Sequence, residues 1–544
     1  MGFYDSIRVG ASGTGESYEV EKSLRFDNGS SAYLSRTAGS PTNQNKGTFS
    51  GWVKRTKNAH GTVIFGGGGG SQTNTNAEQL AYISSDTIAS SYKGGLGGCS
   101  IGWYMYGTRK LRDLSAWMHI CISFDWTQSG DSNRLKFYIN GVQDTLNSCG
   151  NTGAGFQYVN VSGATQYMGR QDAGGGPYYS HHYLAEAYFI DGTVYTPSDF
   201  TETDSATGQL MPKDSSEVLD AITLGNNGGY YNFSDTSNLG KDHSSNSNDF
   251  TPNNFSVSAG AGNDSVEDTP TNNFPTFNPL DKSSDIVLYN GNLRYSFASR
   301  PNSRTVRTTF ALPSTGKYYW EFLNEQASNN PGRISMGVVN FITESSSYNT
   351  NPNSDSSYMN YSYGGGISIA GSSIGVAGSW YNTERAAIAV DCDTGKFWFG
   401  KVASNGSTTW YNSTAGTDGN PATGANPTTT LTNPSQFMPF GGWHEGGSGS
   451  EFFSASINFG QQAFLGTPPT GYKKFNSTNL PDPTILLPNK HFDTLLYTGN
   501  NGTQNITGLN FDPDWVWAKN RQDAGYHHDL YDTVRGDNLR IFST

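Results

Sequence analysis

The chain has little charge, few cysteines and no long apolar run, and each shortage argues against a class of protein. Asp, Glu, Lys and Arg make up only 15% of the 544 residues, and the net charge is −12. Nucleic-acid binding along a chain needs clustered cations, so we expect no nucleic-acid partner. No apolar run reaches the roughly 18 residues of a membrane-spanning helix, so we expect no membrane insertion. The first residues also lack the apolar stretch of an export signal.

The four cysteines leave the redox compartment open. They are Cys99, Cys121, Cys149 and Cys392. Four cysteines are too few for disulfides to be the main stabilisation of a chain of this length, and no two have the spacing of a metal site. Cys121 lies in an apolar run, where a buried free thiol is the favoured interpretation. Cys99 and Cys149 lie in glycine-rich surroundings and could pair with each other.

Aromatic residues and glycine are abundant instead. The chain has 30 Phe, 31 Tyr, 11 Trp and 67 Gly, although its hydrophobic fraction is only 34%. Short runs of alternating apolar and polar residues recur between Gly, Asn, Asp, Ser and Pro clusters, and Asn140-Gly141 and Asp393-Thr394-Gly395 are hairpin turns by composition. We therefore expect an all-β protein with two antiparallel β-sandwich (jelly-roll) domains in tandem, an N-terminal arm and a short C-terminal segment.

Composition shifts divide the chain into five parts. The clearest shift is the polar stretch 234–284, which we interpret as a linker or an extended wrapping segment. The parts are an N-terminal attachment arm (1–20), a first sandwich (21–233), the polar segment (234–284), a second sandwich (285–475) and the start of a further C-terminal domain (476–544).

Two family resemblances follow from motifs inside the sandwiches. The first set of motifs is SLRF (23–26), FSGWVK (49–54), AWMHI (116–120), LKFYING (135–141) and YLAEAYFIDG (183–192). In order and spacing this set is similar to laminin-G-like, concanavalin-type jelly rolls. The second set is GKYYWEF (316–322), IAVDCDTGKFWF (388–399), MPF (438–440) and INFG (457–460), and it resembles a SPRY-type sandwich more loosely.

The whole arrangement resembles tail-fibre and related virion proteins of marine bacteriophages. The resembling stretches are the opening GFYDSIRVGASG (2–13), the Asn- and Asp-rich residues 248–274 and the C-terminal run LNFDPDWVWAK (509–519). The resemblance implies a virion protein that assembles in the host cytoplasm and is released by lysis. It also implies attachment to other virion proteins through the N-terminal arm, and a homotrimer. Both folds host many unrelated functions, so chemistry has to be argued from residues.

Glycan hydrolysis needs two carboxylates at a fixed separation, and no closely alternating acidic run supplies them. Glu186 and Asp191 flank a strand but are five residues apart, so in a regular strand they face opposite ways and a structural role is favoured. Glu445 lies in a glycine-rich loop, and an exposed loop residue without a catalytic role is the favoured interpretation. We expect no enzymatic activity.

Metal sites have two sets of candidates. The pairs His181-His182 and His527-His528 lack further ligands at zinc spacing, so surface or packing roles are favoured. Asp235, Asp242 and Asp249, with nearby asparagines, offer the oxygen ligands that calcium prefers. Turn formation explains these aspartates without a metal and is the favoured interpretation. No cofactor is certain, and calcium stays open.

Aromatic side chains in loops are the candidates for binding a host-surface glycan. In the first sandwich they are Trp103, Tyr104, Tyr106, Tyr178 and Tyr179, and in the second they are Tyr358, Tyr361, Tyr363, Trp380, Trp410 and Trp443. For each single residue, packing in the core or at a subunit interface is the favoured interpretation, whereas for the set as a whole we expect at least one patch that faces a ligand.

We therefore expect a non-enzymatic phage structural protein, a tail-fibre or appendage component that mediates attachment to a host-surface glycan. A head fibre or capsid decoration protein is the first alternative. A carbohydrate-active enzyme and an exported bacterial adhesin are the others.

Overall fold

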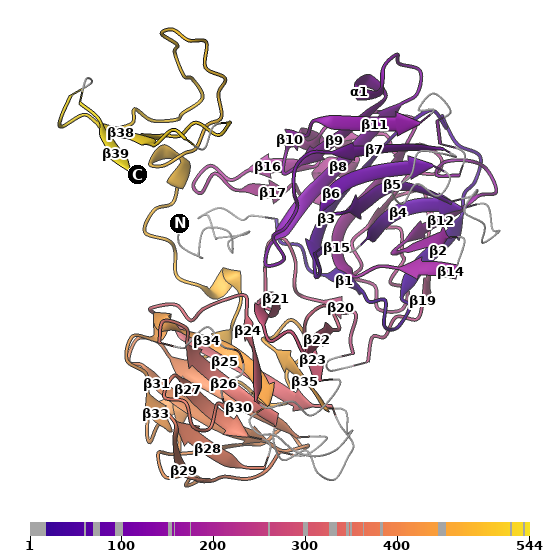
Figure 1. The fold of residues 1–544 in the computed structure, drawn as a ribbon. Helices are drawn as coiled ribbons and strands as arrows, with labels where there is room; N and C mark the ends of the chain where they lie inside the picture. The colour runs from indigo at the N-terminus through magenta and orange to yellow at the C-terminus, as the bar shows by residue number, and fades with distance from the viewer. Residues whose placement is uncertain are drawn as a thin grey trace. The chain divides into compact units, whose positions relative to one another are not determined.

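The computed structural model confirms an all-β architecture with two antiparallel sandwiches (Figure 1). It describes residues 18–58, 61–68, 77–92, 102–150, 155–156, 158–173, 176–258, 262–297, 303–325, 334–343, 348, 351–362, 364–380, 384–443, 453–522, 525–536 and 539–543. Most of the predicted N-terminal arm therefore lies outside the described residues, as do Cys99, Tyr363 and Glu445. In the described part of the chain, no helix is long and apolar enough to cross a membrane.

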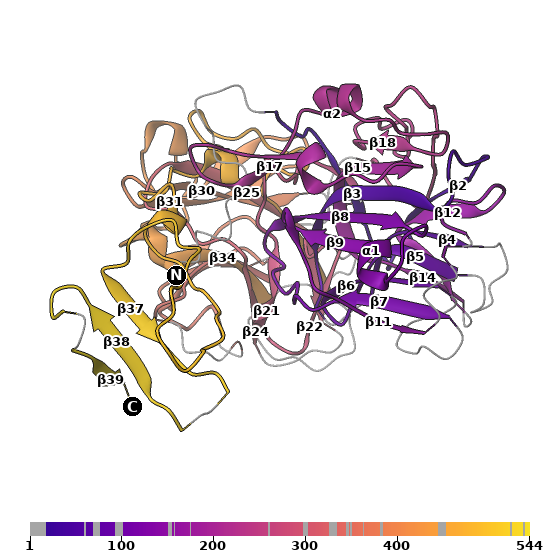
Figure 2. The same ribbon diagram turned by 90° about the horizontal axis from the view of Figure 1, so that it is seen from above.

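Two antiparallel sheets form the first sandwich. One has the strand order β10-β9-β8-β3-β15-β1-β20, with β18 paired to β15, and the other has the order β11-β7-β6-β5-β4-β12-β2-β19. Figure 2 shows β8, β3 and β15 side by side. The bounds of the first sheet are β1 Ser23–Phe26, β3 Lys46–Arg55, β8 Trp117–Asp125, β9 Leu135–Ile139, β10 Val142–Gln143, β15 His182–Asp191, β18 Gly229–Tyr231 and β20 Ser265–Val266. Those of the second are β2 Tyr33–Thr37, β4 Thr62–Gly68, β5 Ala77–Ser84, β6 Thr87–Tyr92, β7 Trp103–Gly107, β11 Leu146–Gly150, β12 Thr165–Met168 and β19 Thr251–Asn253.

Smaller elements complete this part of the chain. They are the hairpins β13 Arg170–Ala173 with β14 Gly176–Tyr179 and β16 Thr201–Thr203 with β17 Leu210–Pro212, and the helices α1 Asp131–Arg134, η2 Pro197–Asp199 and α2 Ser215–Ala221. The core lies between the two sheets, where Leu24 and Phe49 of one sheet meet Phe65 and Met105 of the other.

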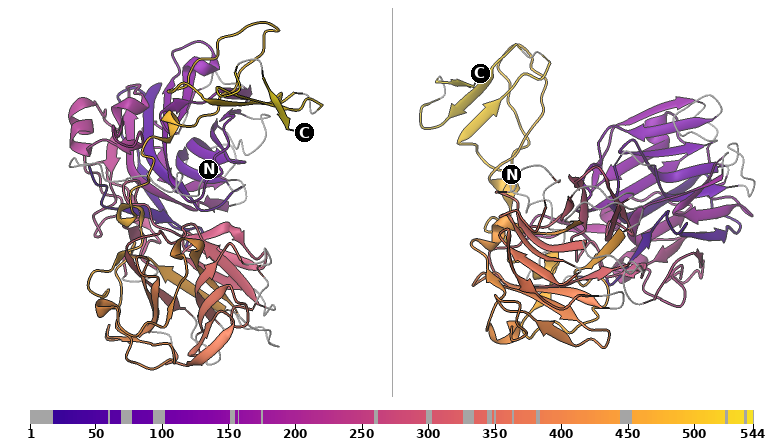
Figure 3. Two further views of the ribbon diagram at one scale, coloured as in Figure 1. Left: turned by 90° about the vertical axis from the view of Figure 1, so that its left-hand side faces the viewer. Right: turned by 60° about the horizontal axis from the view of Figure 1, so that its bottom comes forward.

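The second sandwich is also built from two sheets, drawn in salmon and orange (Figure 3). One has the order β21-β24-β34-β26-β27-β28-β29, with bounds β21 Phe277–Lys282, β24 Arg304–Thr308, β26 Ile334–Asn340, β27 Tyr358–Ser362, β28 Gly366–Ile369, β29 Ser372–Val376 and β34 Phe437–Trp443. The other has the order β22-β23-β35-β25-β30-β31-β32, with β36 paired to β25 and β33 to β31. Its bounds are β22 Ile286–Tyr289, β23 Arg294–Phe297, β25 Lys317–Asn324, β30 Arg385–Asp391, β31 Lys396–Val402, β32 Thr408–Trp410, β33 Thr429–Thr430, β35 Phe453–Asn458 and β36 Lys473–Lys474.

Residues from Asp482 onward group with Asp204–Gly208 as a second compact unit. It contains η6 Pro488–Lys490 and the sheet β37-β38-β39, with bounds β37 Trp515–Ala518, β38 His528–Asp532 and β39 Ile541–Ser543. Among the described residues of 482–544, none is buried.

Both predicted hairpin turns are confirmed. Asn140 and Gly141 have φ values of 48° and 79° between β9 and β10, and Gly395 has a φ of 72° between β30 and β31. These left-handed conformations suit Asn and Gly and match the twist of the flanking strands.

The polar segment 234–284 supplies strands to both sandwiches. Strand β19 pairs with β2 and β20 pairs with β1, while β21 pairs with β24 of the second sandwich. Leu239 and Phe250 are buried in the first core. The segment is therefore structured, and its part up to Val266 completes the first sandwich.

The cysteines have distinct states. Cys121 and Cys392 are free and buried, which confirms the prediction for Cys121. Cys149, on β11, is disulfide-bonded.

Candidate functional site

Strand β7 carries aromatic side chains on both of its faces. Trp103 and Met105 belong to the core, and Trp103 is only 1% exposed. Tyr104 and Tyr106 alternate with them and are half-buried on the opposite face, as the two-residue period of a strand requires. The prediction that these residues lie in a loop is therefore wrong, and Trp103 cannot face a ligand.

Tyr104 and Tyr106 belong to a larger group on the outer face of this sheet. Their rings stack with centroids 5.1 Å apart and 25° between their planes. Tyr82 of β5 and Tyr178 of β14 pack in the same cluster. We call these four residues the tyrosine cluster. It brings together three of the predicted glycan-binding residues, all half-buried, and includes Tyr82, which is only 3% exposed and packs against them without offering a face to a ligand.

Two hydroxyl groups of the cluster stay protonated, and one of them already donates within the protein. Burial raises the pKa of Tyr104 and raises that of Tyr178 to about 12, so both hydroxyls keep their protons at neutral pH. The Tyr178 hydroxyl donates to the carbonyl of Gly61 at 2.9 Å. Asn147, on the neighbouring strand β11, is exposed and lies directly opposite Tyr106, so its amide is on the same face.

This combination can hold a sugar ring. Flat tyrosine faces offer apolar area to the C–H groups of a pyranose, while hydroxyl and amide groups alongside can bond to its hydroxyls. A sheet surface positions these groups more rigidly than a loop does.

The other predicted aromatic residues are not brought to this face. Trp380 is 0% exposed in an irregular segment, where its indole donates to the carbonyl of Ser362 at 3.2 Å. Trp443 is buried in the core at the end of β34. Their proposed contact with a ligand is therefore wrong, because core packing encloses them.

The remaining candidates, three tyrosines and one tryptophan, lie on strands outside the tyrosine cluster. Tyr358 and Tyr361 are buried on β27, which corrects their placement in loops. Trp410 is half-buried on β32 and packs edge-on against Tyr319. Tyr179 is half-buried on β14.

The aspartates predicted to bind calcium are engaged in local turns. Asp242 is buried and accepts backbone N–H groups on both oxygens, from Tyr230 at 3.0 Å and Asn248 at 2.7 Å. Asp249 accepts from the backbone N–H of Asp242, and Asp235 accepts from the residues that follow it. Within the described ranges, no group of three acidic, His or Cys side chains could hold a metal ion. Turn formation accounts for these aspartates.

The acidic pair on β15 has structural partners. Asp191 accepts backbone N–H groups from Thr42 at 2.6 Å and Asn43 at 3.0 Å. Glu186 lies in the β-bulge of this strand with a φ of 49° and is fully enclosed. Tyr230 and Tyr18 donate to its carboxylate at 2.9 Å and 3.1 Å. Burial nevertheless raises the pKa of Glu186 to about 7.

The histidine pairs also have packing partners. His182 is buried and stacks on Phe26 with centroids 4.6 Å apart, and burial lowers its pKa to about 3. His528 accepts a hydrogen bond from the indole of Trp517 at 2.6 Å.

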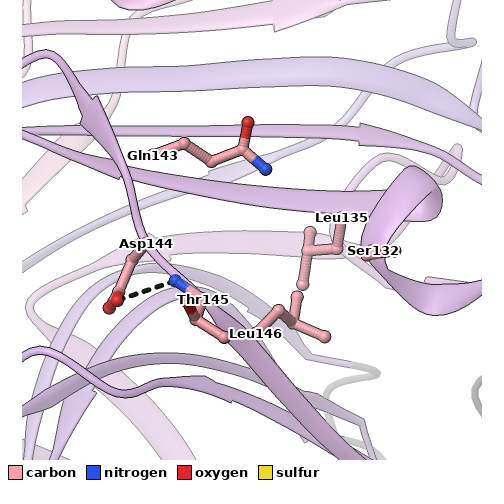
Figure 4. Close-up of a pocket in the computed structure, with 6 residues that line it drawn as sticks. All are labelled: Ser132, Leu135, Gln143, Asp144, Thr145 and Leu146. Carbon is pink, nitrogen blue, oxygen red and sulfur yellow. Dashed lines mark hydrogen bonds between the residues drawn. The ribbon is translucent and has the colours of Figure 1, made fainter. Parts of the chain in front are cut away.

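One pocket of about 310 Å³ lies beside β11 (Figure 4). It is lined by Ser132, Leu135, Gln143, Asp144, Thr145 and Leu146. Asp144 is held by the backbone N–H groups of Thr145 at 2.8 Å and Arg109 at 3.1 Å, so its carboxylate fixes the loop. Leu146 of the pocket and Asn147 of the candidate surface are consecutive residues of β11.

Sequence reasoning missed Tyr82 and Asn147. Regular alternation in residues 79–84 (QLAYIS) would place Tyr82 on the same face as Leu80, and only the register shift between Gln79 and Tyr82 separates the two. Asn147 has no signal in the sequence either, because its position depends on the register of β11 with β7.

Residues 27–181 match the family described as the Concanavalin A-like lectin/glucanases superfamily. The concanavalin-type prediction for the first sandwich is thereby confirmed. Residues 487–544 match a second family, described as Domain of unknown function (DUF7483). No curated protein matches the chain.

Several solved structures are similar to parts of this chain. The SPRY domain of human HERC1 is 14% identical, with a TM-score of 0.26, and the match covers 33% of this chain and 96% of that one. A putative carbohydrate binding protein from Bacteroides ovatus is 18% identical, with a TM-score of 0.29 and coverage of 43% and 59%. Tailspike protein 2 from Escherichia coli O157:H7 bacteriophage CAB120 is 14% identical, with a TM-score of 0.21 and coverage of 34% and 27%. All three TM-scores are low, so these likenesses establish neither family nor function.

Proposed function

We propose that this protein is a non-enzymatic structural component of a phage particle, a tail fibre or related appendage, whose first sandwich binds a host-surface glycan. The observation that carries the binding role is the tyrosine cluster on the outer face of a lectin-type sandwich. The phage assignment is supported by the resemblance of residues 2–13, 248–274 and 509–519 to tail-fibre proteins.

The superfamily that matches residues 27–181 includes lectins and glucanases, so binding must be weighed against hydrolysis. A retaining or inverting glycosidase needs one carboxylic acid and one carboxylate free to meet the substrate. In the described part of the first sandwich, Asp144, Asp191 and Glu186 each hold protein donors. These engagements favour a binding surface over a hydrolytic site.

The binding role is tested with polysaccharide purified from the surface of the host bacterium. The double variant Tyr104→Ala/Tyr106→Ala should lose at least tenfold in affinity, because stacking and burial of two rings are removed. Tyr289→Ala, a half-buried tyrosine on β22 of the second sandwich, is the matched control and should bind like the wild type. Equal affinity of all three proteins would contradict the assignment of the surface.

Two further measurements separate the alternatives. Incubation of the protein with the same polysaccharide should release no reducing ends, and steady release would establish a carbohydrate-active enzyme. Electron cryomicroscopy of intact particles should place the protein in a tail appendage. Density on the head would establish a head fibre or decoration protein, and its absence from virions would favour a bacterial adhesin.

A further inference from the structure

A lysine, an aspartate and an asparagine meet in the interior, between β3 and the segment that follows β20. The Nζ atom of Lys54 donates to Oδ2 of Asp268 at 2.7 Å and to Oδ1 of Asn273 at 2.7 Å. It also donates to the carbonyl of Phe274 at 2.7 Å. The three side chains are 1%, 1% and 0% exposed, in the order named.

Aromatic residues enclose this triad. Lys54 Nζ lies 5.9 Å from the centre of the Tyr183 ring, and the Trp117 and Tyr183 rings pack against each other. The indole of Trp117 donates to Oδ1 of Asp268 at 2.9 Å. The aspartate is therefore oriented with one oxygen on the indole and the other on the lysine.

The amide of Asn273 is oriented as well. Its Nδ2 donates to the carbonyl of Ser115 at 2.9 Å, so Oδ1 is the atom that faces the lysine. Because a C=O bond is about 1.23 Å long, Nζ of Lys54 lies within about 3.9 Å of Cγ of Asn273. This separation is close to that of a reactive ground-state conformer.

An ion pair in such a place is costly, since two charges are removed from water. Burial lowers the pKa of Lys54, while Asp268 opposes this effect. Transfer of one proton from Lys54 to Asp268 gives a neutral amine and a neutral carboxylic acid, and it leaves the amine beside a polarised amide carbonyl.

We propose that Lys54 and Asn273 form an intramolecular isopeptide bond, with Asp268 as the proton carrier. After the proton transfer, the lone pair of Nζ attacks Cγ of Asn273, and the π electrons of the carbonyl move to Oδ1. Collapse of this tetrahedral adduct breaks the Cγ–Nδ2 bond. Nδ2 leaves as ammonia, with its own two hydrogens and one hydrogen from Nζ.

The atoms and charges balance without a further reactant. Of the three hydrogens of the Lys54 ammonium, one remains on the new amide, one leaves with ammonia and one remains on Asp268. The buried ion pair is thereby replaced by a neutral amide and a neutral acid. The proposed isopeptide bond is independent of glycan binding, because none of its three residues belongs to the tyrosine cluster.

The bond would tie strand β3 to the segment between β20 and β21. Residues 54 to 273 would then form one closed covalent loop that contains most of the first core, all but its residues from β1 to β3 such as Leu24 and Phe49. A cross-link of this kind restricts the unfolded chain in the way that a disulfide does, but no reductant can open it.

Intact-mass spectrometry of the denatured wild-type protein tests the proposal directly. We expect a mass about 17 Da below that of the sequence, for the loss of one ammonia. Proteolysis should yield a branched peptide that joins Lys54 to Asn273. Lys54→Arg and Asp268→Asn should each have the full mass of their own sequences, while Lys317→Arg, a matched control whose partner is Asp391, should keep the deficit.

Each other outcome overturns the proposal. A wild-type protein with the full sequence mass contains no such bond. A loss of about 17 Da without the branched peptide would come from cyclisation of another side chain. A branched peptide between Lys54 and Asp268, with loss of water, would make the aspartate the acceptor and refute the role of Asn273. Because the wild type carries the decisive measurement, poor folding of a variant does not affect the conclusion.

Discussion

Replacement of Glu186 by Gln should change how the stability of the first sandwich depends on pH. Burial raises the pKa of this carboxyl from 4.5 to about 7, against the opposing hydrogen bonds from Tyr230 and Tyr18. Between these two pH values the folded state holds more protons than the unfolded state, so stability falls as the pH rises. The contribution is fully present below about pH 4.5 and amounts to about 3 kcal/mol, lost as the pH rises through about 7.

Glu186→Gln carries no titrating proton and keeps the shape of the side chain. The Tyr230 and Tyr18 hydroxyls can accept from its amide as well as donate to it. The variant should match the wild type near pH 4 and exceed its free energy of unfolding by up to about 3 kcal/mol near pH 8. Urea unfolding at several pH values, followed by tryptophan fluorescence, measures this difference.

The difference isolates Glu186 from other titrating groups. Burial lowers the pKa of His119 and of His182 to about 3, so both make the stability depend on pH, but equally in the two proteins. Glu217→Gln, on the exposed face of α2, is the matched control for the same Glu→Gln change outside the core. A Glu186→Gln effect that does not grow between about pH 5 and 8 would refute the reasoning.

Three further substitutions or truncations test the second sandwich and the C-terminal unit by denaturant or thermal unfolding. Trp380→Ala should destabilise the second sandwich by about 3–5 kcal/mol, because it empties a fully enclosed site; a loss below about 1 kcal/mol would mean that the core is not closed there. Glu321→Ala should cost about 2–3 kcal/mol, because it leaves the backbone N–H groups of Leu465 and Gly466 without their acceptor, whereas an unchanged midpoint would show that water replaces the carboxylate. A chain that ends at Pro481 should keep the melting temperature of the sandwiches within about 2 °C, since the residues removed are not buried where described; a larger fall would reveal packing against them.

The sequence predicted the architecture well, because strand alternation and turn chemistry are local signals. Asn140 and Gly141 form a hairpin turn with positive φ, as the backbone preferences of Asn and Gly predict. The aromatic residues of β7 were harder to place, since glycines on both sides of Trp103 and Tyr104 favoured a loop and both faces of the strand are aromatic. Only the pairing with β6 and β11 decides which face is the core.

The buried triad could not be predicted at all. Lys54 and Asp268 are 214 residues apart, and each is unremarkable in its local surroundings. Their meeting depends on the path of the chain after β20. The same holds for Glu186, whose enclosure depends on a bulge in β15 and on Tyr18 from the N-terminal side.

The late strands β19 and β20 have a consequence for synthesis on the ribosome. Strands β1 and β2 are made among the first forty residues and pair with β15 and β12, yet β2 gains its second partner only when residues 251–253 have left the exit tunnel, and β1 only when residues 265–266 have. Until then both edges of the nascent sandwich present unpaired backbone groups to neighbouring chains. A shortened gene product that stops at the end of the matched region, near residue 181, would also lack β15, which pairs with both β1 and β3. Recombinant fragments should therefore extend at least through Val266 to remain free of aggregation.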